Sequence, residues 1–380
     1  MQILNGHVYL DTFQFKKTHL LIKGPYIDAL TDTRPFTDYS PPFIDATDCY
    51  VIPGLIDIHL HGACGYDFCD ATYEALSNIA TYELKNGITT IFPTTMTLPF
   101  EETCHILKAI TKYHQNSNPL GSSIGGVHLE GPYISANQCG AQDASACRSP
   151  HLEEFKQLQK VANGLIRYVT LAPELEGAFP FIQALSNEII LSQGHTCADY
   201  TTSLTALQLG CRHLTHCYNA MPPLHHREPG VIGAAIDYGK AYIELICDGL
   251  HLHPAMIRQS FKFFDSDHII LVSDSTMATG LSDGDYTLGG SPIKVKKGEA
   301  RTLQGNLAGS TTHLMDCLRQ AVSFGIPLEI ALKCVTANPA REAGLYHQIG
   351  SILPGKYADC VILNQNLEII HVIKHGQLIL

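Results

Sequence analysis

The chain has 380 residues, of which 45% are hydrophobic and 16% are charged, against a usual charged share of about 25%. This composition excludes a disordered chain, and the length predicts one large domain together with a smaller one. The 25 basic and 36 acidic residues give a net charge of −11, which argues against a nucleic-acid partner because a phosphate backbone would be repelled.

Neither a membrane-spanning segment nor a secretion signal is recognisable in the sequence. No apolar run approaches the roughly 18 residues of a spanning helix, and the start of the chain lacks the basic, apolar and small-residue regions of a signal peptide. We therefore expect a soluble, cytoplasmic protein with no membrane partner. The 13 cysteines include no C-x-x-C pair, so we predict free thiols rather than disulfides or a thiolate zinc site.

In chain order, the first segment, residues 1–49, consists of short strand patterns separated by Gly, Pro and Asn turns. Residues 350–380 have the same character. Because these two ends flank everything between them, we predict that they meet in one small β-sandwich domain. Residues 50–349 would then form the large domain.

Eight short apolar runs rich in β-branched residues recur through the large domain, and each ends in polar residues. They begin at Tyr50, Gly87, Ile124, Ile166, Glu188, Cys211, Tyr242 and His268. Helical patterns lie between several of them, at 71–87, 100–113 and 200–210, and two more follow the last run at 310–325 and 327–344. Alternating strands and helices predict a parallel sheet, and eight such units match an α/β fold of the (β/α)8 TIM-like barrel type. A doubly wound open sheet is the competing architecture, but no G-x-G-x-x-G follows the first strand.

Ligand-type side chains gather at the carboxyl ends of these strands, which is where a barrel carries its active site. They are His59 and His61 on the first strand, His128 and Glu130 on the third, and His195, His216 and Asp274 on the fifth, sixth and eighth. Residues two apart on a strand face the same way about 6.6 to 7 Å apart, so the first two histidines can converge on one ion. Nitrogen and carboxylate ligands predict a divalent cation such as Zn, Fe, Mn or Co. We expect His128 to support a ligand rather than to bind the ion itself.

Asp274 follows the apolar strand HIILVS and admits two interpretations. It could cap the next helix. Alternatively, it could act as the base that takes a proton from water at the metal and returns it to a leaving group. The ligand-type residues at the other strand ends favour the base.

The motifs along the chain resemble those of the N-acetylglucosamine-6-phosphate deacetylases of the amidohydrolase superfamily. They are PGLIDIHLHG, HLEGPYIS, GHT, THCYNAMPPLHHREPG, DGLHLHP, SDSTMATG, LAGS and PGKYADCVIL, and they span almost the whole chain. The resemblance implies a metal-dependent hydrolase that converts N-acetyl-D-glucosamine 6-phosphate to D-glucosamine 6-phosphate and acetate in amino-sugar catabolism. The alternatives are a deacetylase of another N-acyl substrate, such as N-acetylgalactosamine 6-phosphate or an N-acyl amino acid, and a non-catalytic sugar-phosphate sensor.

The resemblance also implies a role for each ligand-type residue. Glu130, His195 and His216 are similar to the primary metal ligands of the family, and His59 and His61 to the ligands of a second ion. One or two ions per subunit are therefore expected. Asp274 is similar to the catalytic acid–base, which can also bind metal. Many relatives in the superfamily bridge two ions with a lysine after the fourth strand, but here that strand reads RYVTLAPE and the glutamate replaces the lysine.

The substrate contacts that the resemblance implies come from four loops. They are Ala141, Gln142, Asn219, Ala220, Arg227, His251, Leu307, Ala308 and Gly309. The arginine suits a phosphate because its planar fork donates two parallel hydrogen bonds. Gln142 stands where some members carry a histidine that polarises the substrate amide, and a neutral amide donates a hydrogen bond without carrying charge. In the family some phosphate contacts come from a neighbouring subunit, so a homodimer is implied.

Overall fold

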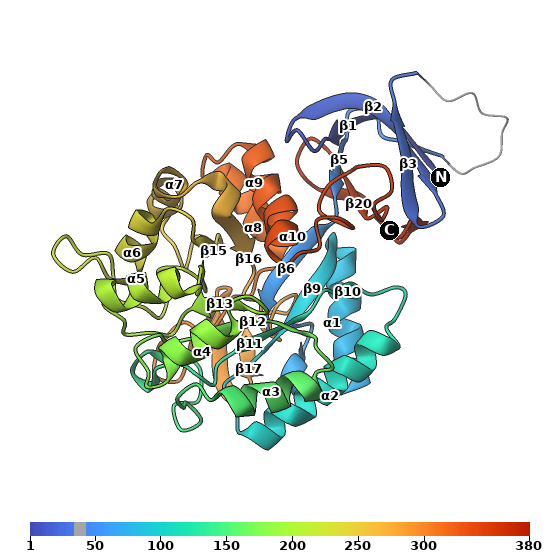
Figure 1. The fold of residues 1–380 in the computed structure, drawn as a ribbon. Helices are drawn as coiled ribbons and strands as arrows, with labels where there is room; N and C mark the ends of the chain where they lie inside the picture. Colours follow the sequence, from blue (N-terminus) through green and yellow to red (C-terminus); the bar gives the residue numbers. More distant parts are fainter. Residues whose placement is uncertain (34–42) are drawn as a thin grey trace.

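The computed structural model describes residues 1–33 and 43–380, and the part of the predicted terminal domain at 34–42 lies outside the described residues. The chain forms a helix-covered barrel and a smaller domain of strands beside it (Figure 1). Both termini lie in the smaller domain, coloured blue and red at the two ends of the sequence. The two chain ends therefore meet as expected.

The large domain is a nearly closed barrel of eight parallel strands, which confirms the predicted fold. In order around the barrel they are β6 (Leu55–Leu60), β9 (Ile88–Thr95), β11 (Val127–Glu130), β12 (Ile166–Leu171), β13 (Ile190–Gln193), β14 (His213–Leu214), β15 (Tyr242–Ile246) and β16 (Ile269–Val272). A short strand, β10 (Ser123–Ile124), also pairs with β9. The chain beyond β16 meets β6 where the Asp274 N–H donates to the His59 carbonyl at 2.9 Å.

Helices cover the outside of the barrel (Figure 1). They are α1 (Tyr73–Lys85), α2 (Phe100–Gln115), α3 (Leu152–Val161), α4 (Ala178–Leu185), α5 (Tyr200–Leu209), α6 (Gly230–Tyr238), α7 (Pro254–Phe263), α8 (Leu314–Ser323), α9 (Leu328–Val335) and α10 (Ala337–Glu342). The side chain of Asp199 caps α5 by accepting from the Thr202 N–H, and Gly210 ends it with a φ of 116°. The helical pattern at 327–344 forms two helices rather than one, because Pro339 lacks the N–H that a continuous helix would use.

The smaller domain is one hydrogen-bonded sheet built from both ends of the chain. Its strands run in the order β22 (Gln377–Leu378), β21 (Ile369–Lys374), β20 (Cys360–Leu363), β5 (Tyr50–Pro53), β1 (Gln2–Tyr9), β2 (Phe15–Lys23) and β3 (Tyr26–Thr31), with β4 (Phe43–Asp45) paired to β1. Because β5 lies between β20 and β1, the boundary expected after residue 49 separates this strand from its sheet. We propose that the boundary lies at Gly54, between β5 and β6.

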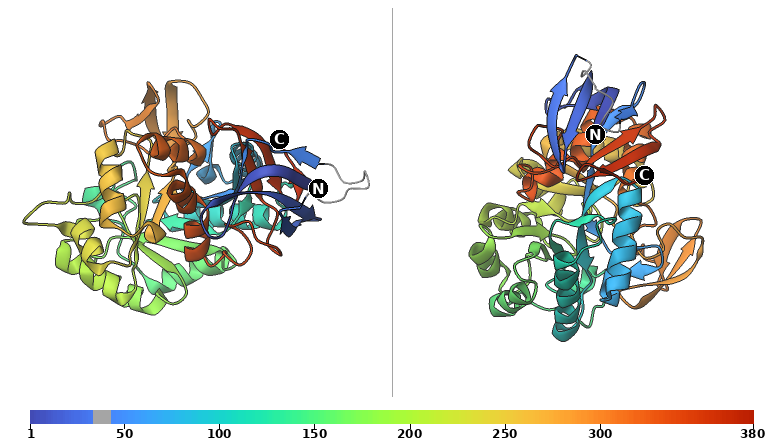
Figure 2. Two further views of the ribbon diagram at one scale, coloured as in Figure 1. Left: turned by 90° about the horizontal axis from the view of Figure 1, so that it is seen from above. Right: turned by 90° about the vertical axis from the view of Figure 1, so that its right-hand side faces the viewer.

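A third unit, which the sequence patterns did not predict, follows β16. The strands β17 (Gly284–Leu288), β18 (Ser291–Lys296) and β19 (Glu299–Thr302) form a small antiparallel sheet that projects from the barrel, in orange in Figure 2. A small apolar cluster that includes Met96, Ala278, Leu288 and Ala308 holds this sheet against the barrel. The sheet therefore brings the segment at 301–309 to the carboxyl ends of the barrel strands.

Among the described residues, no helix combines the length and the apolar character needed to cross a bilayer. All 13 cysteines are free thiols, as expected. Six of the 13 are half-buried or exposed, with Cys197 the exposed one, so the thiols are not uniformly part of the core.

Candidate active site

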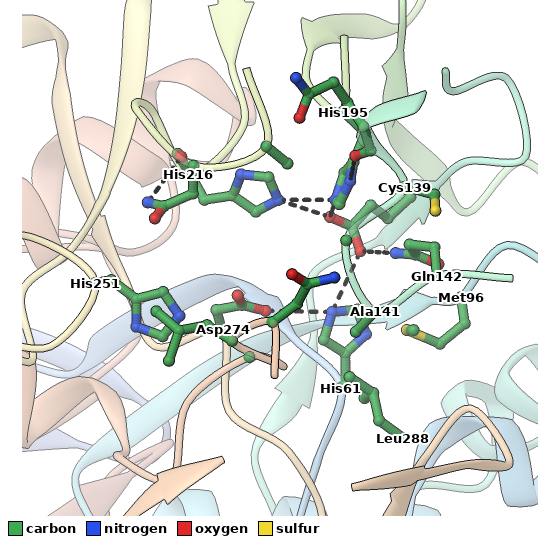
Figure 3. Close-up of a pocket in the computed structure, with 18 of the residues that line it drawn as sticks. His61, Met96, Cys139, Ala141, Gln142, His195, His216, His251, Asp274 and Leu288 are labelled. Atoms are coloured by element: carbon green, nitrogen blue, oxygen red, sulfur yellow. Dashed lines mark hydrogen bonds and ion pairs between the residues drawn. The ribbon is translucent and has the colours of Figure 1, made fainter. Parts of the chain in front are cut away.

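A cavity of about 520 Å³ opens at the carboxyl ends of the barrel strands (Figure 3). Its floor carries His61, Glu130, His195, His216 and Asp274, which come from five different strands or from the turns just after them. Its walls come from the loop at 137–142, the loop after β15 and the segment after β19. The barrel thus gathers residues that are far apart in the sequence.

Glu130, His195 and His216 form the first group of ligand-type atoms. Nε2 of each histidine lies 3.1 Å from Oε1 of the glutamate, and the two ring nitrogens are 3.0 Å apart. The Nδ1–H of His195 donates to the Gln138 carbonyl at 2.8 Å, which leaves Nε2 facing the glutamate. One ion at this point would meet two nitrogens and a carboxylate oxygen, a set that suits Zn and similar cations.

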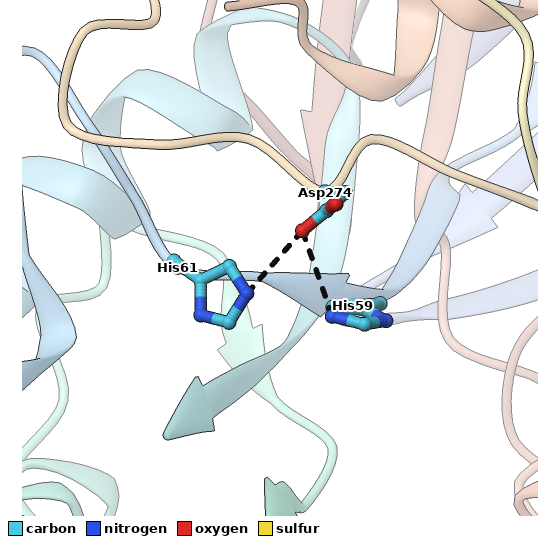
Figure 4. A group of neighbouring side chains, drawn as sticks. All are labelled: His59, His61 and Asp274. Atoms are coloured by element: carbon cyan, nitrogen blue, oxygen red, sulfur yellow. Dashed lines mark ion pairs between the residues drawn. The ribbon is translucent and has the colours of Figure 1, made fainter. Parts of the chain in front are cut away.

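His59, His61 and Asp274 form the second group (Figure 4). Nε2 of His61 lies 3.3 Å from Asp274 Oδ1, and Nε2 of His59 lies 3.6 Å from the same oxygen. Glu130 connects the two groups, because its Oε2 lies 3.3 Å from His61 Nε2 and its Oε1 lies 3.4 Å from His59 Nε2. His59 on β6 and His61, just after the strand, therefore converge as their spacing predicts.

The chemistry of this cluster fits a divalent metal site. All of its side chains are buried, and Nε2 of His59 has no hydrogen-bond partner among the described residues although it faces two carboxylates. Burial alone would raise the pKa of Glu130, but His59 and the hydrogen bonds of the other histidines hold it well below its usual value. Burial alone would also raise the pKa of Asp274, but the hydrogen bond from His61 and the neighbouring imidazoles outweigh burial. The pKa of Asp274 is therefore below its usual value. Both carboxylates are therefore ionised and ready to bind a cation.

His128 lies beside His59, with the ring centroids 4.7 Å apart, and its ligand atom lies near those of His59 and Glu244. Its Nδ1 meets the Ile58 carbonyl at 3.0 Å and its Nε2 meets Thr170 Oγ1 at 2.7 Å, so both ring nitrogens are already used. Burial lowers the pKa of His128 to about 3, which keeps the ring neutral. The expectation that it supports a ligand rather than binding an ion stays a prediction.

Seven of the nine residues expected to contact substrate line the cavity, namely Ala141, Gln142, Asn219, Ala220, His251, Leu307 and Gly309. Ala308 does not, because its side chain turns the other way and is buried in the apolar cluster under β17–β19, while its N–H donates to the Ala300 carbonyl. Arg227 does not line the cavity either. It lies beside a separate hollow with Cys197 and Pro229, and its guanidinium meets the ring of His226 at 2.7 Å.

Gln142 is held tightly at the edge of the metal cluster. Its Nε2 donates to Glu130 Oε2 at 2.6 Å, and its Oε1 accepts from the Thr97 N–H at 2.6 Å. The carboxylate thus takes one of the two amide protons that could otherwise reach a substrate carbonyl. Gln142 therefore orients Glu130, a predicted metal ligand. The resemblance to the family relates Gln142 only to a histidine that polarises the substrate amide, and it does not predict this contact.

Sequence reasoning missed Glu244, Gln138 and Arg301. Glu244 lies in the middle of β15 and accepts from the Nδ1–H of His59 at 2.9 Å. A single carboxylate inside the apolar run YIELIC was the signal that could have drawn attention to it. The sequence around Gln138 and Arg301 shows no comparable feature. Gln138 contacts His195 through its backbone carbonyl, which any residue type could supply. Arg301 lines the cavity only because the unpredicted β17–β19 sheet brings it there.

Known proteins resemble the chain over nearly its whole length. An N-acetylglucosamine-6-phosphate deacetylase from Bacillus subtilis is 37% identical over 370 residues, which cover 96% of this chain and 93% of the relative. An N-acetylgalactosamine-6-phosphate deacetylase from Escherichia coli O157:H7 is 36% identical over 86% of each chain. A similar solved structure is the D267A mutant of N-acetyl-D-glucosamine-6-phosphate deacetylase from Mycobacterium smegmatis in complex with N-acetyl-D-glucosamine-6-phosphate. The match has a TM-score of 0.93 and 30% identity, and it covers 100% of this chain and 99% of that chain.

The amidohydrolase family model matches residues 50–379, which include β5, the whole barrel and the C-terminal strands. Every group of the metal cluster lies inside this range. The chain belongs to the amidohydrolase family.

Proposed function

We propose that this protein hydrolyses the acetamide of N-acetyl-D-glucosamine 6-phosphate to D-glucosamine 6-phosphate and acetate. The observation that carries the proposal is the convergence of two histidine–carboxylate groups on one cavity, with Asp274 among the residues that line it. The relatives named as deacetylases of this sugar phosphate support the choice of substrate.

We assign Glu130, His195 and His216 as the ligands of a first divalent ion, and His59 and His61 as those of a second. Zn, Fe, Mn and Co all suit these donors, and one or two ions per subunit are expected. An ion bound here supplies a Lewis acid that polarises the substrate carbonyl and makes water more acidic.

Asp274 carries the proton transfers. Its pKa is held below its usual value, so the carboxylate is ionised and can accept a proton from the attacking water. The same carboxyl group then donates that proton to the amine nitrogen as the amide C–N bond breaks. Its backbone fixes the carboxylate, because the Asp274 N–H donates to the His59 carbonyl and the Asp274 carbonyl accepts from the Ser310 N–H at 2.6 Å.

The phosphate group would bind beside His251, Asn219 and Ala220, which line the cavity. Burial lowers the pKa of His251, but the Asp248 carboxylate, 2.6 Å from Nδ1, outweighs it and raises the pKa above its usual value. A protonated imidazole here would attract the phosphate. Binding at this end would hold the 2-acetamido group over the metal cluster, so that binding energy is converted into orientation.

The Asp274→Asn variant tests the proposal. We expect it to retain its metal content and to bind the sugar phosphate, while acetate release falls at least about 100-fold because the proton carrier is lost. Elemental analysis and an acetate assay would measure both. Asp237→Asn makes the same change at an exposed position and should leave both unchanged. An Asp274→Asn variant that works at close to the wild-type rate would refute the assignment.

The C4 epimer is the second candidate substrate, because the Escherichia coli relative named for N-acetylgalactosamine 6-phosphate is almost as similar as the Bacillus subtilis one. Comparing kcat/KM for the two epimers separates the candidates, and our proposal expects the larger value for the glucosamine compound. A larger value for the galactosamine compound would transfer the assignment to that substrate.

We further propose that the protein works as a cytoplasmic homodimer. The free thiols suit a reducing compartment. Arg227 lies outside its own chain's cavity, which leaves it available to a neighbouring subunit.

A further inference from the structure

Glu244 is the charged residue of an otherwise apolar strand and is completely buried. Its carboxylate accepts three hydrogen bonds. Oε2 accepts from the Nδ1–H of His59 at 2.9 Å and from the backbone N–H of His216 at 2.8 Å, and Oε1 accepts from the Nε2–H of His213 at 3.1 Å. A carboxylate without such partners would be very costly at this depth.

The bond to His59 decides which ring nitrogen is available. Because the Nδ1–H donates to Glu244, Nε2 is the nitrogen that faces the cavity floor, 3.4 Å from Glu130 Oε1 and 3.6 Å from Asp274 Oδ1, and it is the one left to bind an ion. Histidines that bind metals generally make such a bond through the other nitrogen, which fixes the tautomer, orients the ring and increases its basicity.

The bond to the His216 backbone acts on the other ligand group. His216 follows β14 with a φ of 28°, a strained conformation for a residue with a side chain, and its N–H points to the same Oε2 that holds His59. A single oxygen atom therefore fixes one residue from each of the two ligand groups. The far side of the network leads through His213 to Glu342 on α10, at 2.6 Å.

We propose that Glu244 is a positioning residue of the metal centre, which fixes the ring of His59 and the backbone of His216 so that both present Nε2 to the ions. The proposal rests on the metal-binding role assigned above to His59. Glu244 does not line the cavity, so it would act on the ions through His59 and His216.

The test measures the affinity of metal-free protein for Zn²⁺ alone, by competition with a chelator. Glu244→Gln keeps an oxygen that accepts from His59 and His216 but removes the negative charge. We expect the binding event that uses His59 to weaken about 10- to 100-fold. Glu342→Gln is the matched control, because it alters the same network at a residue that contacts His213 and Tyr168 but no assigned ligand, and its Zn²⁺ affinity should stay within about twofold of wild type.

Two further variants keep the test decisive. Should Glu244→Gln fail to fold, Glu244→Asp retains the charge but shortens the side chain by one methylene, so it should weaken Zn²⁺ binding because the bond to His59 is lost. In a His59→Ala background, Glu244→Gln should add less than about a twofold effect, since no ring remains to orient and the Gln oxygen still accepts from the His216 N–H.

The outcomes separate the inference from the function it rests on. Wild-type Zn²⁺ affinity in folded Glu244 variants, together with weakened binding in His59→Ala, would overturn the positioning role and leave the ligand assignment intact. Unchanged affinity in His59→Ala would overturn the ligand assignment, and the positioning role with it.

Discussion

The side chains of the site are aimed by single residues with unusual backbone angles. His195, His216 and Asp274 each lie two residues beyond the end of a barrel strand and have φ values of 47°, 28° and 49°. The left-handed region is unfavourable for residues with a Cβ, so such angles persist only where the surroundings hold them. Here they turn each side chain from the strand direction into the cavity. The geometry of the ligands therefore depends on the turn after each strand as well as on the strand.

The pH dependence of stability can be predicted from another residue, His213. Its ring lies between two carboxylates, with Nδ1 2.6 Å from Glu342 Oε1 and Nε2 3.1 Å from Glu244 Oε1. Burial lowers its pKa, but Glu342 and Glu244 outweigh burial and raise it from 6.5 to about 10. A group whose pKa is raised on folding stabilises the fold fully below its unfolded value and loses that effect as the pH rises through its folded value.

We therefore expect the free energy of unfolding of the metal-free protein to decline between pH 6.5 and about 10, by an amount on the order of a few kcal/mol. Denaturant unfolding across this range would measure it. His213→Gln should show a flatter dependence over the same interval, although it is less stable at pH 6.5. Parallel curves for the two proteins would show that His213 is not the titrating group.

At the scale of elements, the β17–β19 sheet and the segment after it complete the site. The segment returns across the barrel so closely that Gly309 lies against Asp274. A Cβ at this position would come within 2.8 Å of the Asp274 carbonyl and 2.7 Å of Thr276 Cγ2, and the glycine has a φ of 55°. The contact with the Asp274 carbonyl cannot be relieved without moving the backbone that carries the proposed acid–base.

We expect Gly309→Ala to lower the free energy of unfolding by about 1–3 kcal/mol and to reduce kcat for acetate release, because Asp274 must shift. Thermal unfolding and steady-state kinetics would measure the two effects. Gly305→Ala is the control: it lies in the same segment with a φ of 93°, but no atom lies within 4 Å of its added Cβ. Equal losses of kcat in the two variants would contradict the close contact as the cause.

At the scale of the whole molecule, the cavity of one chain contains no arginine from the THCYNAMPPLHHREPG loop. Arg227 belongs to that loop but lies beside a separate hollow. In the proposed homodimer it would reach the phosphate end of the neighbouring cavity, where His251 already supplies an imidazole. This arrangement can be tested with two deficient variants, one that lacks the arginine and one that lacks the proposed acid–base.

Arg227→Ala and Asp274→Asn chains should complement each other when they are combined in one dimer. One cavity then has an intact Asp274 and receives Arg227 from the other chain, so we expect one working site per mixed dimer. Copurification through two different tags, followed by an acetate assay, would measure this. Activity no higher than that of the Arg227→Ala protein alone would mean that the arginine acts within its own chain or not at all.

The eight strands and the histidine and carboxylate residues at their ends were predictable from the sequence. Strand patterns are local, and a closed parallel barrel brings all carboxyl ends to one face, so that Glu130 and His216 had to come close once the strands were recognised. The assignment of roles to these residues stays a prediction.

Other features were decided only by the tertiary structure, because they depend on which distant segment lies opposite. Strand pairing, not the local pattern, places Tyr50–Pro53 in the terminal sheet. Ala308 does not line the cavity because its own side chain, in an irregular segment, packs into the apolar cluster under β17–β19. The contact of Glu244 with His59 joins residues 185 positions apart, and no local pattern in the sequence specifies such a pair.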